Sequence, residues 1–388
     1  MSQLTRLKVA LVHDWLVTYA GAERVLAALL EIFPQAQIFS VVDFLNEADR
    51  QALGQRKAKT SFIQKLPKAR KHYRHYLPLM PLAVEQWDLR GFDLVISSSH
   101  AVAKGVITGP DQTHICYCHS PMRYAWDLQG QYLQESGLTS GLKSALVRYL
   151  LHKLRLWDYA SAARVDTFIA NSAYIQRRIR TCYRREADVI YPPVAVANLP
   201  VNLGVRESFY VTASRLVPYK KIDLIVRAFQ SHPERTLIVI GEGPQLAQIR
   251  QLAAPYAHIQ VLGYQADAQL QDYLARAQAF IFAAEEDFGI LPVEAQALGT
   301  CVVAYGRGGL SESIRDGHTG YLYRQQTPEA LNAALATLEA ERRHWQAKDY
   351  ADFARACRIQ AEKFQHQHFI EAMQALIAQH CVYESPLG

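Results

Sequence analysis

Short runs of apolar and β-branched residues alternate with helix-like patterns along nearly the whole chain. Within each run the hydrophobic residues follow one another without alternation, which is typical of strands buried on both faces. Because helical segments separate the runs, a parallel sheet with helices on both faces is the expected arrangement. The expected strands are residues 8–13, 37–42, 93–98, 114–118, 167–171 and 189–191, and then 209–213, 236–240, 259–262, 280–283 and 302–305.

The chain of 388 residues is long for one hydrophobic core, and its pattern breaks once. Two prolines after Tyr191 begin a polar stretch that ends near Gly204, where we predict a linker. The expected fold is α/β, with two Rossmann-like domains over residues 1–195 and 205–364 that face a central cleft. One terminal helix, from Tyr350 to about Gln379, is expected to return at about 365–388 to the first domain. Ligands should bind at the carboxyl ends of the strands.

Charge and cysteine usage restrict the class of protein. Residues 1–200 carry 25 Lys and Arg against 16 Asp and Glu, so the first half is basic and suits an anionic partner or surface. Cys116 and Cys118 lie in an apolar run and are interpreted as strand residues rather than metal ligands.

The start of the chain lacks a signal-peptide pattern, and no apolar run reaches about 18 residues. A cytoplasmic location is expected.

The segment from Glu286 to Glu294 follows an expected strand and opens a helix. Backbone N–H groups at a helix start suit a phosphate or a sugar hydroxyl, and Glu294 suits a vicinal diol such as ribose. An acidic helix start favoured by the helix dipole is the structural alternative. The donor-binding residues predicted here are Phe288, Gly289, Ile290, Leu291 and Glu294, with Glu286 as a catalytic candidate.

Arg215 and Lys220 follow the first strand of the second half and are five residues apart across a proline turn. Such a pair can hold a diphosphate from two sides and compensate its charge as a bond to it breaks. The sequence has no Asp-x-Asp motif, so we expect these two cations to replace a divalent metal. A solvated basic loop is the alternative. Lys221 could make the same contact.

Three segments of the first half follow expected strands and carry polar groups. Gly21 opens the first helix and would let the backbone approach a ligand. His119 follows a buried strand and is placed for a reacting sugar, although a structural histidine is an equal reading. Arg123, Tyr124 and Asn171 are candidates for the acceptor side, with an N-cap as the alternative for the last.

Together these residues resemble the family-four (group 1) glycosyltransferases, which have the GT-B fold. The resemblance covers nearly the whole chain and rests on the Glu286/Glu294 pair, the Arg215/Lys220 pair and Gly21. The segment 304–314, with Gly317 and Gly320, is also similar to the family. The segments 13–15, 97–100 and 118–124 resemble a bacterial mannosyltransferase-like branch that builds surface polysaccharides.

The resemblance implies a retaining, metal-independent glycosyltransferase without a cofactor. By carry-over, Glu286 holds sugar hydroxyls, and Asp14 lies near the reacting centre. Gln265 and Asp267 lie at the nucleotide base. Two positions depart from the family pattern, because alanine stands at Ala20 and lysine at Lys221 where glycine is usual.

The resemblance favours GDP-mannose as donor, with another GDP- or UDP-sugar second, and a glycan or lipid-linked glycan as acceptor. Two basic stretches with apolar residues suit an anionic membrane surface at the inner face of the plasma membrane, one from Arg56 to His75 and one from Lys143 to Trp157. A solvated face or a soluble acidic acceptor remains open. No nucleic-acid-binding motif accompanies them.

Other functions also use a double-Rossmann plan. An epimerase is disfavoured by the paired cations and glutamates, and a phosphorylase by the absence of a lysine-aldehyde cofactor signature. A dehydrogenase is disfavoured by the absence of a G-x-G-x-x-G helix start. A catalytically silent nucleotide-sugar-binding subunit of a polysaccharide assembly is the alternative from another class.

Overall fold

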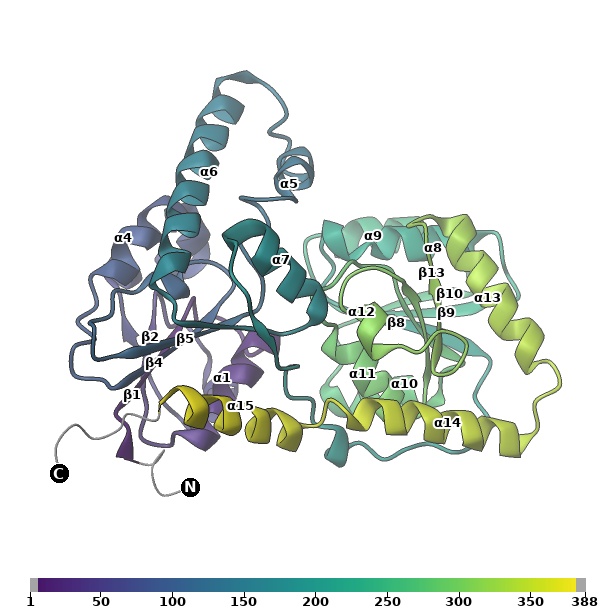
Figure 1. The fold of residues 1–388 in the computed structure, drawn as a ribbon. Helices are drawn as coiled ribbons and strands as arrows, with labels where there is room; N and C mark the ends of the chain where they lie inside the picture. The colour runs from purple at the N-terminus through teal and green to yellow at the C-terminus, as the bar shows by residue number, and fades with distance from the viewer. Residues whose placement is uncertain (1–5, 382–388) are drawn as a thin grey trace. The chain divides into compact units, whose positions relative to one another are not determined.

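The computed structural model describes residues 6–381 of the chain. Two compact units divide the chain, unit 1 being Met1–Pro193 with Gln367–Gly388 and unit 2 being Val194–His366. Residues 1–5 and 382–388, which the predicted domains include, lie outside the described residues. Each unit contains one parallel sheet with helices on both sides, so the predicted pair of α/β domains is confirmed (Figure 1).

Unit 1 has a seven-stranded parallel sheet in the order β3-β2-β1-β4-β5-β6-β7. Its strands are β1 (Val9–His13), β2 (Gln37–Ser40), β3 (Lys59–Thr60), β4 (Leu94–Ser99), β5 (Thr113–Cys118), β6 (Thr167–Ala170) and β7 (Asp188–Val189). Its helices are α1 (Gly21–Ile32), α2 (Glu47–Gln51), η2 (Phe62–Lys65), α3 (Ala69–His72), η3 (Tyr73–Leu79), α4 (Met80–Glu85), η4 (Ala103–Gly105), α5 (Gln129–Glu135), α6 (Gly141–Ser161), η5 (Ala162–Arg164), α7 (Ala173–Tyr183) and α15 (His366–His380).

The sheet of unit 1 is buried on both faces, as its continuous apolar runs predict. Alternate residues of β1 show this, since Leu11 packs with one core and Val12 with the other. The first core also contains the apolar faces of α1 and α15, with Phe369 and Met373 contributed by α15. The predicted return of the terminal helix to the first domain is therefore confirmed (Figure 1).

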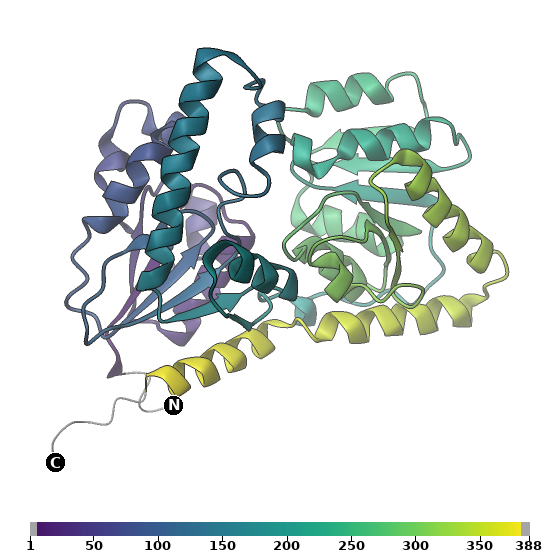
Figure 2. The ribbon, with the colours of Figure 1, turned by 45° about the horizontal axis from the view of Figure 1, so that its top comes forward.

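Unit 2 has a six-stranded parallel sheet in the order β10-β9-β8-β11-β12-β13. Its strands are β8 (Phe209–Ala213), β9 (Thr236–Ile240), β10 (Ile259–Gly263), β11 (Ala279–Phe282), β12 (Cys301–Tyr305) and β13 (Gly320–Tyr323). Its helices are η6 (Val196–Asn198), η7 (Pro218–Lys220), α8 (Ile222–Gln230), α9 (Leu246–Ala253), α10 (Asp267–Arg276), α11 (Ile290–Ala297), α12 (Leu310–Ser313), α13 (Pro328–Arg342) and α14 (Ala347–Glu362) (Figure 2).

Three features differ from the sequence predictions. Strands β3 and β13 were not expected, and each forms an edge of its sheet. The predicted single terminal helix is two helices, α14 and α15, which end and begin on either side of residues 363–365. The predicted linker is partly bonded to unit 2, because Asn202 N–H donates to the Leu298 carbonyl at 2.9 Å.

Among residues 6–381, no helix is both long enough and apolar enough to cross a membrane.

Candidate active site

The order of the strands reverses direction at one point in each sheet. In unit 1 this switch point lies between β1 and β4, and in unit 2 between β8 and β11. Loops that leave adjacent strands at a switch point diverge, and ligands of open α/β sheets bind there, at the carboxyl ends. Of the segments singled out from the sequence, that of Gly21 follows β1, that of Arg215 and Lys220 follows β8, and that of Glu286 follows β11.

At the switch point of unit 2, Lys220 and Glu286 form an ion pair. Lys220 ends η7, which follows β8, and Glu286 lies after β11, so adjacent strands place the two side chains together. Each side chain is 16% exposed. The ammonium group also lies 5.4 Å from the centre of the Phe282 ring. A partly buried cation is therefore held at this edge by a carboxylate and an aromatic face.

The loop that carries Glu286 is fixed by a pair of glycines. Gly309 N–H donates to the Glu286 carbonyl at 2.8 Å. A Cβ atom at Gly308 would lie 2.2 Å from the Glu286 carbonyl oxygen, and one at Gly309 would lie 2.2 Å from the Asp287 carbonyl oxygen. Only glycine permits this approach of two backbone segments, so the 306–309 loop sets the position of Glu286.

Helix α11 begins at Ile290, after Gly289 with a φ of +86°. The helix therefore starts slightly later than the sequence suggested, and its first-turn N–H donors are those of Ile290 and Leu291, since Pro292 has none. The Phe288 side chain is buried against Phe364, with ring centres 5.3 Å apart. Phe288 thus anchors the loop by packing. Glu294 lies within α11 and is half-buried.

The second predicted cation of unit 2 differs from the first. Arg215 is exposed, which leaves its guanidinium group accessible at the end of β8. Lys221 has a φ of +56°, a conformation that glycine adopts without strain. This explains why glycine is favoured at that position and why lysine there carries a backbone cost.

Gln265 and Asp267, predicted to meet the base, follow β10. Gln265 is half-buried, and Asp267 is the exposed first residue of α10. Neighbouring Tyr264 is 65% exposed. The strand order puts this loop two strands away from the Lys220 loop, with β9 between them.

At the switch point of unit 1, Ser98 joins two histidines. Its hydroxyl oxygen lies 3.1 Å from Nδ1 of His13 and 2.8 Å from Nε2 of His119. Nε2 of His13 lies 3.4 Å from the Glu23 carboxylate, which can only accept. One consistent assignment has Nε2–H of His119 donating to the Ser98 oxygen and the Ser98 hydroxyl donating to Nδ1 of His13. Nε2–H of His13 then donates to the Glu23 carboxylate. In that assignment Nδ1 of a neutral His119 is an acceptor.

Burial lowers the pKa of His119 well below its usual value, and His100 and His13 add to the effect. Burial also lowers the pKa of His100, against the opposing charge of Asp14. Both imidazoles are therefore held in the neutral form near pH 7, which suits hydrogen bonding to sugar hydroxyls better than charge compensation.

Asp14, predicted to lie near the reacting centre, binds the turn that follows β4. The Asp14 carboxylate is completely buried and accepts four backbone N–H groups, from residues 100, 101, 102 and 103, at 2.6–3.0 Å. It also lies 3.0 Å from Nδ1 of His100. Its oxygens are thus occupied by the turn after β4, so we assign Asp14 to positioning that turn.

The remaining candidates of unit 1 lie near the same edge. Gly21 begins α1, and Glu23 accepts the N–H of Ala20 at 3.0 Å, which fixes this helix start. Asn171 follows β6 and is buried, while Ser172 is the N-cap of α7. Arg123 and Tyr124 are half-buried after β5. The Tyr124 hydroxyl is buried without a hydrogen-bond partner among residues 6–381.

Family models match both halves of the chain. The model for glycosyltransferase family 4 matches residues 19–198, and the model for glycosyl transferases group 1 matches residues 200–360. The chain belongs to this glycosyltransferase family.

Two curated relatives illustrate the likeness within the family. The D-inositol 3-phosphate glycosyltransferase of Gordonia bronchialis is 30% identical over 202 residues, which is 47% of this chain and 42% of the relative. The GDP-mannose-dependent alpha-(1-6)-phosphatidylinositol monomannoside mannosyltransferase of Mycolicibacterium smegmatis is 30% identical over 148 residues, 34% of this chain and 39% of that one. The chain spans about half the length, or less, of the curated relatives that it matches.

Solved structures of other proteins share the fold of this chain. Sucrose-phosphate synthase from Thermosynechococcus elongatus aligns with a TM-score of 0.69 at 16% identity, covering 97% of this chain and 99% of that one. Anabaena HepE in complex with UDP-glucose aligns with a TM-score of 0.68 at 18% identity, over 96% and 99% of the chains. At these identities the likeness concerns the fold alone.

One pair of glycines in unit 2 was missed from the sequence. A Cβ at Gly241 would lie 1.9 Å from the Ser214 carbonyl oxygen, and one at Gly243 would lie 2.4 Å from that of Leu216. These glycines follow β9 and support the loop that carries Arg215. Two glycines directly after a buried strand were the available signal.

Proposed function

We propose that this protein is a retaining glycosyltransferase that moves a hexose from a nucleotide-sugar donor onto a glycan or lipid-linked acceptor. The observation that carries the proposal is the Lys220–Glu286 pair at the switch point of unit 2, beside the first turn of α11. Unit 2 binds the donor in this proposal, and unit 1 supplies the acceptor side and His119.

The proposed chemistry follows from charge. Negative charge develops on the departing diphosphate as the glycosidic bond breaks, and Lys220 and Arg215 compensate it without a metal ion. Glu286 orients the ammonium group and accepts from sugar hydroxyls. The acceptor oxygen attacks the anomeric carbon on the face from which the diphosphate leaves, and its proton passes to the departing phosphate oxygen. Neutral His119 accepts from a hydroxyl of the transferred sugar.

Lys220→Ala tests the charge compensation. We expect turnover to fall about 100-fold or more, as for the loss of one preorganised donor to a developing anion. Donor hydrolysis and sugar transfer are measured for the wild type, Lys220→Ala and Glu286→Ala, with and without EDTA. Arg355→Ala, in an exposed ion pair with Asp352, is the matched control. Near-wild-type turnover in Lys220→Ala contradicts the role of Lys220. Background turnover in every variant and the wild type favours a silent binding subunit.

We propose GDP-mannose as the donor. Support comes from the sequence resemblance and from the relative whose name specifies GDP-mannose. A GDP- or UDP-linked alternative is kept in the test, since HepE was solved with UDP-glucose. A ligand that binds only the folded state raises the melting temperature. GDP-mannose, GDP-fucose, UDP-glucose and UDP-N-acetylglucosamine are compared at equal concentration. A larger shift with a UDP-sugar than with GDP-mannose overturns this choice.

We further propose that unit 1 contacts an anionic membrane at the cytoplasmic face. Support comes from α6, which includes the second basic stretch and exposes large apolar side chains, namely Leu142, Leu146, Tyr149, Leu156 and Tyr159. The first stretch is not a single helix but runs through β3, η2, α3 and the start of η3.

Vesicle binding tests the membrane proposal. Each basic residue near an anionic surface contributes about 1 kcal/mol. Exchanging Lys68, Arg70, Lys71 and Arg74 for Gln should therefore weaken binding to phosphatidylserine-containing vesicles strongly, with donor affinity unchanged. Equal vesicle sedimentation of this variant and the wild type refutes the contact.

A further inference from the structure

A buried ion pair lies beneath the histidines of unit 1, outside the groups assigned so far. Lys104, in η4, is 1% exposed, and Asp158, in α6, is completely buried. The Lys104 ammonium donates to the carboxylate of Asp158 at 2.5 Å, to its carbonyl at 3.0 Å and to the Ser161 hydroxyl at 2.8 Å. These three contacts use all three N–H donors of a lysine.

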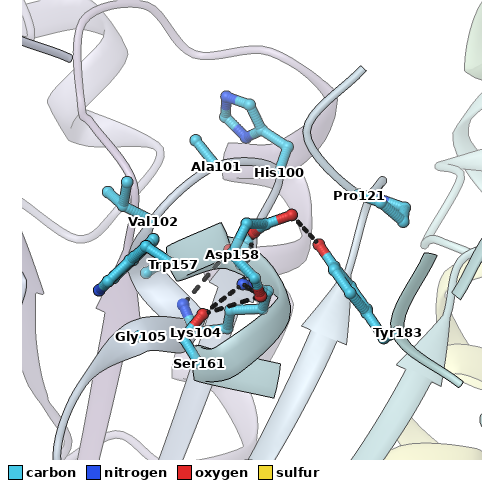
Figure 3. Close-up of polar contacts among 12 residues, drawn as sticks. His100, Ala101, Val102, Lys104, Gly105, Pro121, Trp157, Asp158, Ser161 and Tyr183 are labelled. Atoms are coloured by element: carbon cyan, nitrogen blue, oxygen red, sulfur yellow. Dashed lines mark hydrogen bonds and ion pairs between the residues drawn. The ribbon is translucent and has the colours of Figure 1, made fainter. Parts of the chain in front are cut away.

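The other oxygen of the Asp158 carboxylate is also occupied. It accepts from Trp126 Nε1 at 2.7 Å and from the Tyr183 hydroxyl at 2.9 Å. Figure 3 shows Lys104, Ser161 and Tyr183 gathered around Asp158, with His100 on the same turn as Lys104. The network is fully satisfied and sealed from solvent, so it cannot bind a ligand directly.

A buried ion pair adds little stability compared with apolar residues of similar volume, but it requires one geometry. Here it joins segments that carry the candidate groups. Lys104 ends the turn that presents His100 and wraps the Asp14 carboxylate. Trp126 lies in the segment 119–128, which follows β5 and begins with His119. Asp158 therefore ties the loop after β4 to the loop after β5.

Packing reinforces the same junction. A Cβ atom at Gly105 would lie 2.2 Å from the Trp157 ring, so the ring of α6 lies directly on the backbone of the His100 turn. The Lys104 ammonium lies 5.4 Å from the centre of that ring and 5.0 Å from the centre of the Tyr183 ring. Small shifts of α6 must therefore move the turn.

We propose that Lys104 and Asp158 are a positioning pair that sets His100 and His119 relative to each other for the transfer reaction. This inference rests on the proposed glycosyltransferase function. The pair acts through the two loops and touches neither donor nor acceptor. Its loss should therefore reduce turnover while the affinity for the donor is retained.

Kinetics of Lys104→Met test the pair. Arg50→Met is the matched control, because Arg50 forms a partly buried two-bond pair with Asp43 elsewhere in unit 1. Both variants remove the cation of an ion pair, which is fully buried for Lys104 and partly buried for Arg50. We expect Lys104→Met to lower kcat at least tenfold with the donor KM within twofold, whereas Arg50→Met keeps kcat within twofold. An equal loss of kcat in both variants, or a loss confined to KM, overturns the proposal.

Tyr183→Phe provides a second test in case Lys104→Met does not fold. This variant removes only the hydrogen bond from the Tyr183 hydroxyl to Asp158 and leaves the charges unchanged. In histidine-labelled protein we expect the imidazole NMR signals of His100 and His119 to shift in Tyr183→Phe but not in Arg50→Lys. Unchanged signals in Tyr183→Phe overturn the positioning role. The NMR measurement does not require transferase activity. If the signals shift but the protein has no transferase activity, the positioning role is supported and the proposed function is rejected.

Discussion

The backbone of Gly308 lies so close to Glu286 that a methyl group added at Gly308 should displace Glu286. The variant Gly308→Ala therefore tests whether the position of Glu286 matters for catalysis. The new Cβ would lie 2.2 Å from the Glu286 carbonyl oxygen, against 3.4 Å or more in ordinary contact. The 306–309 loop and the Glu286 segment must therefore separate by about 1 Å. Misplacing a catalytic group by about 1 Å can cost about 100-fold in rate, so we expect a loss of that order in kcat.

Alanine at Gly308 also carries backbone strain, because its φ is +82°. This costs roughly 1–2 kcal/mol in any such position. Gly317→Ala isolates that cost, since Gly317 has a φ of +73° and open space around its Cβ position. The assay compares kcat and the denaturation midpoint of both variants. Similar loss of stability with unequal kcat supports the reasoning, whereas kcat values within threefold of each other refute it.

Three further outcomes are expected. Lys221→Gly should stabilise the protein by about 1 kcal/mol in thermal unfolding, because φ is +56° there; an unchanged donor KM would assign the diphosphate contact to Lys220. Burial lowers the pKa of His114 to about 4, so the unfolded chain takes up the proton first as pH falls below about 6.5. Folding stability should therefore decrease by about 3 kcal/mol from pH 7 to 4 through this residue, and His114→Gln should remove that part of the pH dependence in urea titrations. Asp14→Asn should cost about 2–4 kcal/mol in the same titrations, because one amide oxygen cannot accept four N–H groups; a cost below 1 kcal/mol would contradict the account of Asp14.

The fold was predictable where hydrophobicity is continuous. Every residue of strands β8 and β12 is buried, and their sequences carry no competing pattern. Strands β3 and β13 were missed because they are short edge strands, two and four residues long, without a distinctive apolar run. The break between α14 and α15 has no glycine or proline to mark it. Val194 makes it instead, by donating to the Phe364 carbonyl and accepting from His366 N–H.

The sequence predicted which segments carry the candidate site residues, but it did not predict which of those residues contact one another. Spacing after strands located Lys220 and Glu286, yet nothing in the sequence pairs residues 66 positions apart. Asp14 was placed near the reacting centre by the family resemblance alone, which gave no contact for its carboxylate. Its actual partners are backbone N–H groups of a turn about 86 residues later, which no side-chain pattern reveals.

Helix α15 has a consequence for biosynthesis. It follows all of unit 2 in the chain, yet Phe369, Met373 and Ile377 complete a core built around β1 and α1. Unit 2 is continuous and can collapse as it leaves the ribosome, whereas unit 1 must wait with an apolar face uncovered until α15 arrives. Nascent chains halted before residue 366 should therefore recruit chaperones through their earliest segment, although that segment was made first.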